Sequence, residues 1–185
     1  TEKNCAVYMK IYKTVCGNLS GVEKIAFEQF VQQEYFREIL REANKRFEKM
    51  SFGRYRMLNR KNAADKRSVS GLDIDVLDNY TGKVRGADTL SGGEAFKASL
   101  SLALGLSDVI QRYAGGVYAD TVFIDEGFGS LDSQSLDAAV SILEQLTEGN
   151  KTIAVISHVD ELKNRIDKQI FVKNSQKGST VEMYM

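Results

Sequence analysis

Two adjacent carboxylates, Asp125 and Glu126, stand at the end of a β-branched apolar run at 121–125. In open parallel sheets, ligands bind beyond the carboxyl ends of the strands, so carboxylates in this place are aimed at a site. One carboxylate of such a pair can hold Mg²⁺, directly or through water, while the other orients and deprotonates an attacking water molecule. A solvated acidic strand end explains the pair equally well when it is taken alone, because loop carboxylates are common.

A second group, Ser91-Gly92-Gly93-Glu94, opens an apolar helix that we expect to run to about residue 113. Glycines let a ligand approach the backbone, and the exposed N–H groups and dipole of a helix N-terminus favour an anion such as phosphate. The same residues also fit an ordinary capping box, with Ser91 as N-cap and Glu94 at the third helical position. In isolation the capping box is the favoured interpretation.

His158, the only histidine in the chain, follows a second apolar run at 152–157. An amphipathic stretch at 136–146 separates the two runs, so strand, helix and strand predict a βαβ unit with a right-handed crossover. Because neighbouring parallel strands point the same way, His158 is expected at the same sheet edge as the two carboxylates. A packed loop histidine is the alternative interpretation.

Other elements must position these groups. The remaining pattern predicts a helix over residues 27–50, strands over 54–58 and 72–77, a turn at 78–82, and a terminal hairpin of 169–173 with 180–185. The two apolar runs are typical of parallel strands covered on both faces, and the apolar helix that begins at Gly92 is expected to be buried.

The start of the chain has the pattern of a coiled coil. Its apolar residues alternate spacings of four and three at Tyr8, Tyr12, Val15, Leu19 and Val22. These are the a and d positions of a heptad repeat, sustained for about two heptads. We interpret this run as the end of a longer coiled coil.

The composition is that of an ordinary globular protein, with 43% apolar and 27% charged residues and 25 basic residues balancing 25 acidic ones. It excludes disordered chains, collagen and disulfide scaffolds. No run approaches the ~18 apolar residues of a membrane span, and the start does not resemble a signal peptide. We therefore expect a cytoplasmic protein with no membrane partner, in which Cys5 and Cys16 are reduced thiols.

The balanced charge conceals two opposite segments. Residues 41–67 hold ten basic and three acidic side chains, whereas residues 71–137 hold four basic and eleven acidic ones. The basic segment suits a surface that contacts the phosphates of duplex DNA. A solvated helix face and loop is the favoured alternative, because charge runs usually have that explanation.

Together, the motifs carry a family resemblance. LSGGE at 90–94, TVFIDEGFGSLD at 121–132 and the histidine after the next strand resemble the C-terminal half of an ABC-type ATPase head, with signature motif, Walker B motif, D-loop and H-loop in that order. Within that superfamily, DTLSGGEAFKASLSLALGLSDVIQ, FIDEGFGSLD and ISHVDELKNRI are similar to the SbcC family, the ATPase subunits of the SbcC–SbcD nuclease. The resemblance covers nearly the whole chain. It implies an α/β fold, namely the C-terminal lobe of an ABC-type P-loop ATPase head, with a largely parallel sheet, flanking helices and a coiled-coil stump.

The resemblance also implies ATP and Mg²⁺ as cofactors and a role for each motif residue. Asp125 would help to hold Mg²⁺, Glu126 would act on the attacking water, and His158 would contact the γ-phosphate. Ser91, Gly92 and Gly93 would bind the γ-phosphate of ATP held by the opposite head, and Glu94 would support their loop. Asp132 would be the D-loop residue that crosses the dimer interface.

The P-loop motif G-x-x-x-x-G-K-[ST] is missing, since the single Gly-Lys pair, Gly82-Lys83, is followed by Val84. In SbcC-like proteins the P-loop lies in an N-terminal lobe, beyond a very long coiled coil. The resemblance therefore implies that residues 1–22 end the descending coiled coil and that 23–185 form the C-terminal lobe without its P-loop lobe. We expect no appreciable ATP hydrolysis by this chain alone, and an apolar sheet edge or face left open.

The leading functional interpretation is half of a DNA-repair ATPase head, in which ATP binding closes two heads and regulates a partner nuclease. Its implied partners are the P-loop lobe, a second head, the SbcD nuclease, which would dock on residues 1–50, and DNA. An SMC-type chromosome-structuring ATPase shares every catalytic role and is the main alternative. A transporter ATP-binding subunit is less favoured, because its P-loop would lie upstream on the same lobe, where this chain has the pattern of a coiled coil. GFGSLD at 127–132 favours the SbcC family.

Overall fold

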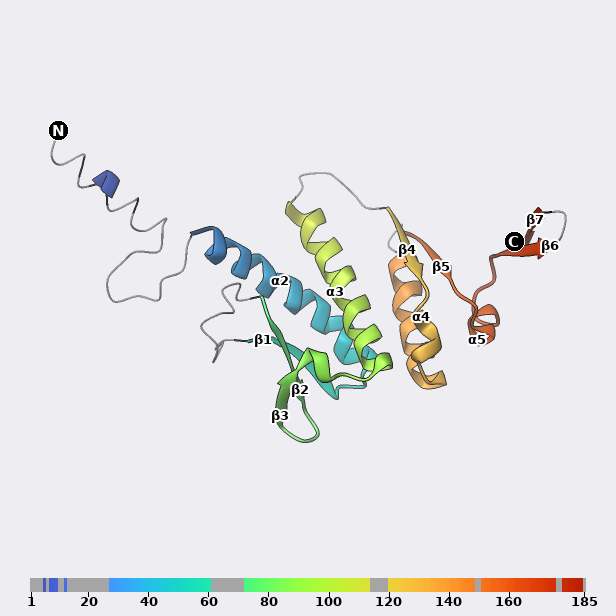
Figure 1. The fold of residues 1–185 in the computed structure, drawn as a ribbon, viewed down its shortest axis with the longest axis horizontal. Coiled ribbons are helices and arrows are strands. Elements are labelled where there is room, and N and C mark those ends of the chain that lie inside the picture. The colour runs from blue at the N-terminus through green and yellow to red at the C-terminus, as the bar shows by residue number, and fades with distance from the viewer. Residues whose placement is uncertain are drawn as a thin grey trace. The chain divides into compact units, whose positions relative to one another are not determined.

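The computed structural model describes residues 5, 7–9, 12, 27–60, 72–113, 120–148, 151–175 and 178–184. The chain forms two compact units, one of Thr1–Leu90 with Ala98–Val117 and the other of Ser91–Lys97 with Tyr118–Met185. Helices and three sheets appear in Figure 1, and one of the sheets is parallel. The predicted α/β fold class is confirmed, although the other two sheets are antiparallel.

Helix α2 (Phe27–Met50) and a three-stranded antiparallel sheet form the base of the first unit. The strands are β1 (Tyr55–Asn59), β2 (Ile74–Asp78) and β3 (Lys83–Gly86), in the order β1-β2-β3. A cluster of buried residues in the core of this unit comprises Leu40, Ala43, Phe47, Tyr55, Met57, Val76 and Ala98. Both predicted strands are confirmed within two residues at each end, whereas β3 was not predicted because its residues include two basic side chains and a glycine.

The C-terminal part of α2 covers the edge of β1 that does not pair with β2. The Asn44 side chain donates from Nδ2 to the Met57 carbonyl at 2.9 Å and accepts from the Met57 N–H at 2.8 Å. The Ser51 hydroxyl accepts from the Tyr55 N–H at 3.2 Å. These bonds satisfy backbone groups that an open edge strand would offer to another chain.

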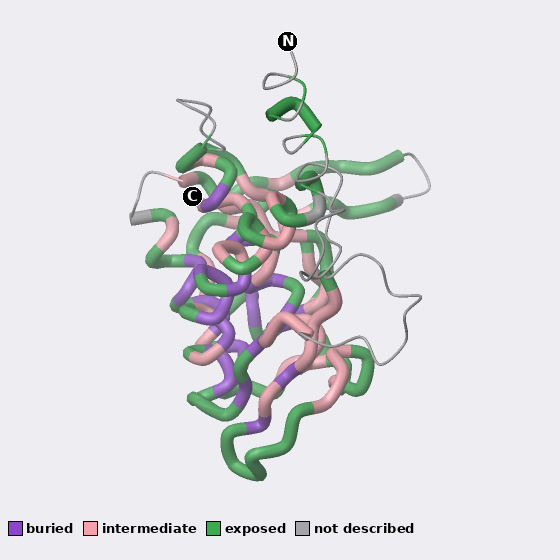
Figure 2. The backbone as a smooth tube through the Cα atoms, turned by 90° about the vertical axis from the view of Figure 1, so that its left-hand side faces the viewer, coloured by how far each residue is buried: buried purple, intermediate pink, exposed green. Residues whose placement is uncertain are grey.

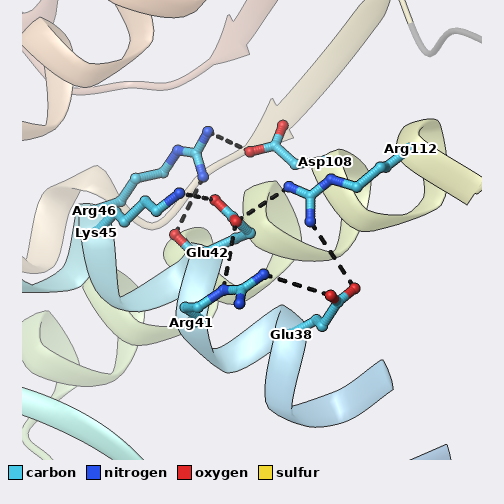
Figure 3. A network of polar contacts seen from close by, with 7 residues as sticks. All are labelled: Glu38, Arg41, Glu42, Lys45, Arg46, Asp108 and Arg112. Atoms are coloured by element: carbon cyan, nitrogen blue, oxygen red, sulfur yellow. Dashed lines mark hydrogen bonds and ion pairs between the residues drawn. The ribbon is translucent and has the colours of Figure 1, made fainter. Parts of the chain in front are cut away.

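The part of helix α3 (Gly92–Tyr113) that belongs to the first unit packs closely on α2. A Cβ atom on Gly105 would lie 2.7 Å from the Ala43 nitrogen and 2.9 Å from the Ile39 carbonyl oxygen. Only a glycine permits this approach. Next to it, the network in Figure 3 joins the two helices through Glu38, Arg41, Glu42, Lys45, Arg46, Asp108 and Arg112.

The positive charges of the basic segment are largely matched by carboxylates of the same unit. Six of the seven described basic side chains of this segment form such ion pairs, namely Arg41, Lys45, Arg46, Arg54, Arg56 and Arg60. Lys61, Lys66 and Arg67 lie outside the described residues. The described part of the segment therefore favours internal charge pairing over a surface that binds phosphates.

The second unit contains the predicted βαβ unit. Strands β4 (Thr121–Asp125) and β5 (Thr152–Ile156) pair in parallel, with Asp125 opposite Ile156, and α4 (Ser133–Glu148) connects them. The short helix α5 (Asp160–Lys163) follows, and then β6 (Gln169–Ser175) and β7 (Gly178–Tyr184) form the predicted terminal hairpin.

Apolar surface remains exposed on several elements. Phe123 on β4 is 72% exposed and Ile156 on β5 is 55% exposed, so the prediction that these strands are covered on both faces is wrong for the described residues. Leu106 and Ile110 are exposed on α3, so the predicted burial of that helix is wrong along one side. One face of the hairpin is also apolar, through Ile170, Val172, Val181 and Met183, and all four side chains are exposed. In Figure 2, exposed residues are green along the backbone. The expectation of an open sheet face is met on β4 and β5.

The predicted coiled coil falls mostly outside the described residues. Residues 5, 7–9 and 12 are helical and exposed, whereas Val15, Leu19 and Val22 are not among the described positions. None of the described helices combines the length and the apolar character that crossing a membrane requires.

Candidate functional site

The second unit holds all eight residues predicted to act on a nucleotide. They stand at three places in the chain: the start of α3, the segment from the end of β4 to the start of α4, and the residues after β5. They are Ser91, Gly92, Gly93, Glu94, Asp125, Glu126, Asp132 and His158.

The backbone turns sharply at the end of β4, through two successive left-handed residues. Glu126 has φ 58° and Gly127 has φ 96°. The left-handed region costs a residue with a side chain about 1 to 2 kcal/mol, so Glu126 is held in a strained conformation. A hydrogen bond from the Glu126 N–H to the Ile156 carbonyl, 2.8 Å long, continues the parallel pairing into the turn.

This turn brings the Glu126 carboxylate to His158. The His158 Nδ1 atom lies 2.9 Å from Oε2 and 3.1 Å from Oε1 of Glu126. Both side chains are accessible, with 81% of His158 and 49% of Glu126 exposed. A Cβ atom on Gly129 would lie 4.0 Å from His158 Nε2. The contact engages Nδ1 and leaves Nε2 as the nitrogen able to meet a ligand.

Asp125 is exposed at the carboxyl end of β4, and its side chain has no hydrogen-bond or ion-pair partner among the described residues. The described part of the chain contains no group of three or more His, Cys, Asp or Glu residues that could hold a metal. Mg²⁺ is often bound by one or two carboxylates with substrate phosphates and water completing its shell. Asp125 therefore fits magnesium held together with a nucleotide.

The start of α3 forms the capping box that the sequence favoured. The Ser91 N–H donates to Glu94 Oε2 at 3.0 Å, and the Glu94 N–H donates to Ser91 Oγ at 3.4 Å. Among the described residues, the N–H groups of Gly92 and Gly93 have no acceptor. Two unused donors at an exposed helix N-terminus suit a phosphate oxygen, so the capping box and phosphate binding are compatible.

Asp132 caps helix α4. Its Oδ1 accepts from the Ser135 N–H at 2.8 Å, and its carbonyl accepts from the Leu136 N–H at 2.9 Å. The hydrogen bond from the Ser135 N–H, followed by the one from the Ser135 hydroxyl, lowers the pKa of the Asp132 carboxyl from its ordinary value. Asp132 is thus a rigidly held anion at the end of the segment after β4.

The first turns of α3 pack directly on that segment, which includes the short helix η2 (Phe128–Ser130). A Cβ atom on Gly93 would lie 2.6 Å from the Ser130 carbonyl oxygen, whereas one on Gly92 would lie 3.8 Å from Ser130 Cβ. The rings of Phe96 and Phe128 meet edge to face, with centroids 4.9 Å apart. The signature and D-loop motifs are therefore in contact within one chain.

Sequence reasoning missed Lys97 and Ser135. Both are buried, and Lys97 Nζ donates to Ser135 Oγ at 3.1 Å. The signal was present, because Lys97 is the one charged residue in the apolar run 95–107. A lysine in such a run needs a partner when it is buried.

Comparison with known proteins finds one matching family model and several similar curated proteins. The family model SbcC/RAD50-like, Walker B motif, matches residues 61–145. The SbcC protein of the SbcCD nuclease of Vibrio cholerae is 49% identical over 176 residues, which covers 91% of this chain and 17% of the relative. The protein of the same name from Treponema pallidum is 47% identical over 170 residues, with 91% and 16% covered. The chain thus spans about a sixth of the length of these relatives.

Solved structures with a similar fold are SMC ATPase heads. One comes from work on ATP-driven dimerization and DNA stimulated activation of SMC ATPases; its TM-score is 0.64 at 21% identity, covering 85% of this chain and 89% of that one. An SmcHead bound to the C-winged helix domain of ScpA gives a TM-score of 0.63 at 23% identity, covering 91% and 48%. At these identities the likeness concerns the fold. The family model and the identity to the curated relatives show that the chain belongs to the SbcC/RAD50-like family.

Proposed function

We propose that this chain is the C-terminal lobe of an SbcC-type ATPase head and that, with an N-terminal P-loop lobe, it binds and hydrolyses ATP with Mg²⁺. The observation that carries the proposal is the arrangement after β4 and β5. There the strained turn at Glu126 presents its carboxylate to His158, directly beside Asp125, whose side chain has no partner among the described residues. Residues 1–22 are proposed as the end of the coiled coil and 23–185 as the lobe.

Each of the three residues has a separate task in this proposal. Asp125 holds the metal, which neutralises phosphate charge when it is bound. Glu126 orients the attacking water and accepts its proton. His158 contacts the γ-phosphate through Nε2, while its Nδ1 contact with Glu126, 2.9 Å long, keeps the ring in place.

The other five residues act across a dimer of heads. Ser91, Gly92 and Gly93 meet the γ-phosphate of ATP bound to the opposite head, Glu94 supports their loop, and Asp132 crosses the interface. The two N–H groups without an acceptor among the described residues support this assignment. So does the capping box, which fixes the first turn of α3 in the shape that presents those groups.

The exposed apolar surfaces support a P-loop lobe as the first partner. A two-stranded parallel sheet is rarely left open to water, because parallel sheets are normally covered on both faces. In the described residues, β4 pairs only with β5, and Phe123 and Ile156 are exposed. The large remainder of the relatives' length is where such a lobe would be encoded.

We further propose that the complete protein acts in DNA double-strand-break repair, where ATP-driven closure of two heads regulates an SbcD nuclease on DNA. The names of the curated relatives support the SbcD partner. The ion pairs of residues 41–60 give no support to DNA contact by that segment, so DNA binding is assigned to the complete head. An SMC-type role is the second candidate, and the lower identity of the SMC structures, 21% and 23%, disfavours it.

Replacing Glu126 with Gln tests the proposal. The chain is co-expressed with the P-loop lobe of a related SbcC protein, and ATP binding, ATP turnover and head dimerisation are measured. The variant is expected to bind ATP, to lose at least about a hundredfold in turnover, and to accumulate as an ATP-bound dimer, because Gln cannot accept the proton from water. The chain without the P-loop lobe is expected to show no turnover.

A matched control is Glu144→Gln, which changes an exposed glutamate on α4. It should leave turnover at the wild-type value. Normal turnover in the Glu126 variant would show that Glu126 does not accept the proton of the attacking water. Turnover by the chain alone at the rate of the two-lobe complex would refute the need for a P-loop lobe.

A further inference from the structure

Lys97 occupies a place where a lysine is costly. It lies in the second turn of α3, only 9% exposed, where desolvation of an ammonium group is unfavourable. The positive end of the helix dipole is also near, which disfavours a cation. A buried charge of this kind is stabilised only by well-placed acceptors.

One acceptor lies far along the chain. Lys97 Nζ donates to Ser135 Oγ at 3.1 Å, across 38 residues, and Ser135 Oγ lies 3.0 Å from Asp132 Oδ2. An ammonium group can only donate, so the Ser135 hydroxyl accepts from Lys97 and donates its own proton to Asp132. The direction of both bonds is therefore set. Lys97 reaches the Asp132 carboxylate through one hydroxyl group.

The same face of α3 makes two more contacts with the segment from Gly127 to Ser135. Gly93 approaches the Ser130 carbonyl, and the Phe96 ring packs on Phe128 and against Gly127. Positions 93, 96 and 97 are spaced by three and four residues and so share one side of the helix. Lys97 supplies the polar and charged contact on that side.

We infer that Lys97 is a positioning residue that, through Ser135, ties the first turn of α3 to the Asp132 carboxylate. This first turn, the signature turn, carries the signature motif at residues 90–94. The turn and the carboxylate are then presented to the opposite head as one rigid unit. This inference rests on the proposed function. It assigns to Lys97 and Ser135 a part in dimer closure, without contact to nucleotide. A displacement of the signature turn, in this scheme, moves Asp132 with it.

The test uses the chain co-expressed with the P-loop lobe of a related SbcC protein and measures ATP-dependent dimerisation, together with ATP binding by the separate heads. Lys97→Met removes the donor and retains the apolar stem, and Ser135→Ala breaks the relay while keeping the backbone N–H bond to Asp132. Each is expected to weaken dimerisation by about tenfold, as for loss of one charge-assisted hydrogen bond, with ATP binding by single heads unchanged.

A merely structural role predicts a different pattern. If Lys97 acts through Asp132, adding Lys97→Met to Asp132→Ala weakens dimerisation no further, whereas independent effects multiply. Lys97→Arg, which keeps a donor, should recover part of the loss. Lys168→Met, at an exposed lysine, is the matched control and should dimerise as the wild type does.

The outcomes separate the two proposals. Wild-type affinity in both Lys97→Met and Ser135→Ala overturns the inference about Lys97 and leaves the proposed function standing. Multiplicative effects in the double variant also overturn it. If the wild-type lobes together form no ATP-dependent dimer, the proposed function fails, and this inference fails with it. Should Lys97→Met not fold, Ser135→Ala alone decides the matter.

Discussion

Gly92 and Gly93, adjacent at the start of α3, have different steric surroundings. A side chain on Gly93 would clash with the Ser130 carbonyl oxygen at 2.6 Å, whereas a side chain on Gly92 would make an ordinary contact at 3.8 Å. Gly127 combines a φ of 96° with a Phe96 ring that fills the space of a side chain. Sequence motifs treat these glycines alike, but their surroundings differ.

The first prediction compares Gly93→Ala with Gly92→Ala. The Gly93 variant must push a backbone carbonyl aside, and overpacking of this kind costs about 1 to 3 kcal/mol. We expect it to lower the unfolding temperature and to speed amide exchange in residues 127–135. Gly92→Ala is the control and should change neither. Equal effects of the two substitutions would contradict the packing of Gly93 on Ser130.

At the scale of the element, α2 has two neighbours and uses different chemistry for each. Toward β1 it presents Asn44, which is 8% exposed and pairs with both backbone groups of Met57. Toward α3 it presents Glu42, which is 6% exposed and accepts from Lys45 and from Arg112. On one side the helix therefore satisfies the backbone groups of an edge strand, as a neighbouring strand would, and on the other side it contributes to an ion-pair network.

The second prediction concerns Asn44→Ala. The substitution leaves the Met57 N–H and carbonyl without partners beside a core position, which costs about 1 to 3 kcal/mol. It also opens the edge of β1, so aggregation of the variant should increase. The control is Asn79→Ala, which removes an exposed bond of 2.8 Å to the Gly53 carbonyl. Denaturant unfolding and light scattering compare the two, and an equal loss of stability would refute this role of Asn44.

The third prediction concerns acid. The hydrogen bond from Lys45, aided by Arg112 and opposed by burial, lowers the pKa of Glu42 below its ordinary value of 4.5. The unfolded chain then binds the proton more readily than the folded one. The stabilisation from Glu42 is therefore complete above about pH 4.5 and is lost as the pH falls through the pKa of the folded state.

Glu42→Gln should destabilise the protein near neutral pH by about 1.5 to 3 kcal/mol, because hydrogen bonds to a charged group are weakened. It should also lose less stability than the wild type between about pH 5 and about pH 3. Thermal unfolding across that range measures both. Glu34→Gln, on an exposed part of α2, removes the same charge and should keep the wild-type acid dependence. Parallel curves for wild type and Glu42→Gln would show that Glu42 does not set this dependence.

At the scale of the whole molecule, the exposed apolar faces dominate. The open face of β4 and β5, one side of α3 and one face of the hairpin all lie in water. Large apolar side chains exposed on the surface of a domain are typical of interaction sites when they gather on one face. The chain covers part of its apolar surface with its own helices, and the proposed P-loop lobe would cover more of it.

The fourth prediction follows from the most exposed of these residues. Phe123→Thr should barely alter the stability of the isolated chain, because 72% of the side chain is already in water. It should reduce self-association of the chain and weaken co-purification with a P-loop lobe, since apolar contact area is lost. Val84→Thr, at an exposed apolar residue of β3, is the control. Unchanged co-purification of the Phe123 variant would exclude the β4 face as the docking surface.

The sequence by itself determined most elements and the identity of the candidate site. Helices α2, α3 and α4, the βαβ unit and the hairpin follow from local periodicity, and the motif residues follow from their order along the chain. It missed β3, because two basic residues and a glycine conceal an edge strand. The sequence also could not show which carboxylates pair with the basic side chains of residues 41–67. It therefore left two alternatives for that segment, a surface that contacts DNA and a solvated helix face and loop.

Only the tertiary structure decided which of these residues meet. The Glu126–His158 contact spans 32 residues, the Lys97–Ser135 bond 38, and the Arg46–Asp108 pair 62. The left-handed backbone at Glu126 and the burial of Lys97 likewise depend on distant neighbours. Local pattern specifies the conformation of a segment. Hydrogen-bond partners, ion pairs and strain depend on contacts that exist only once separate segments have packed together.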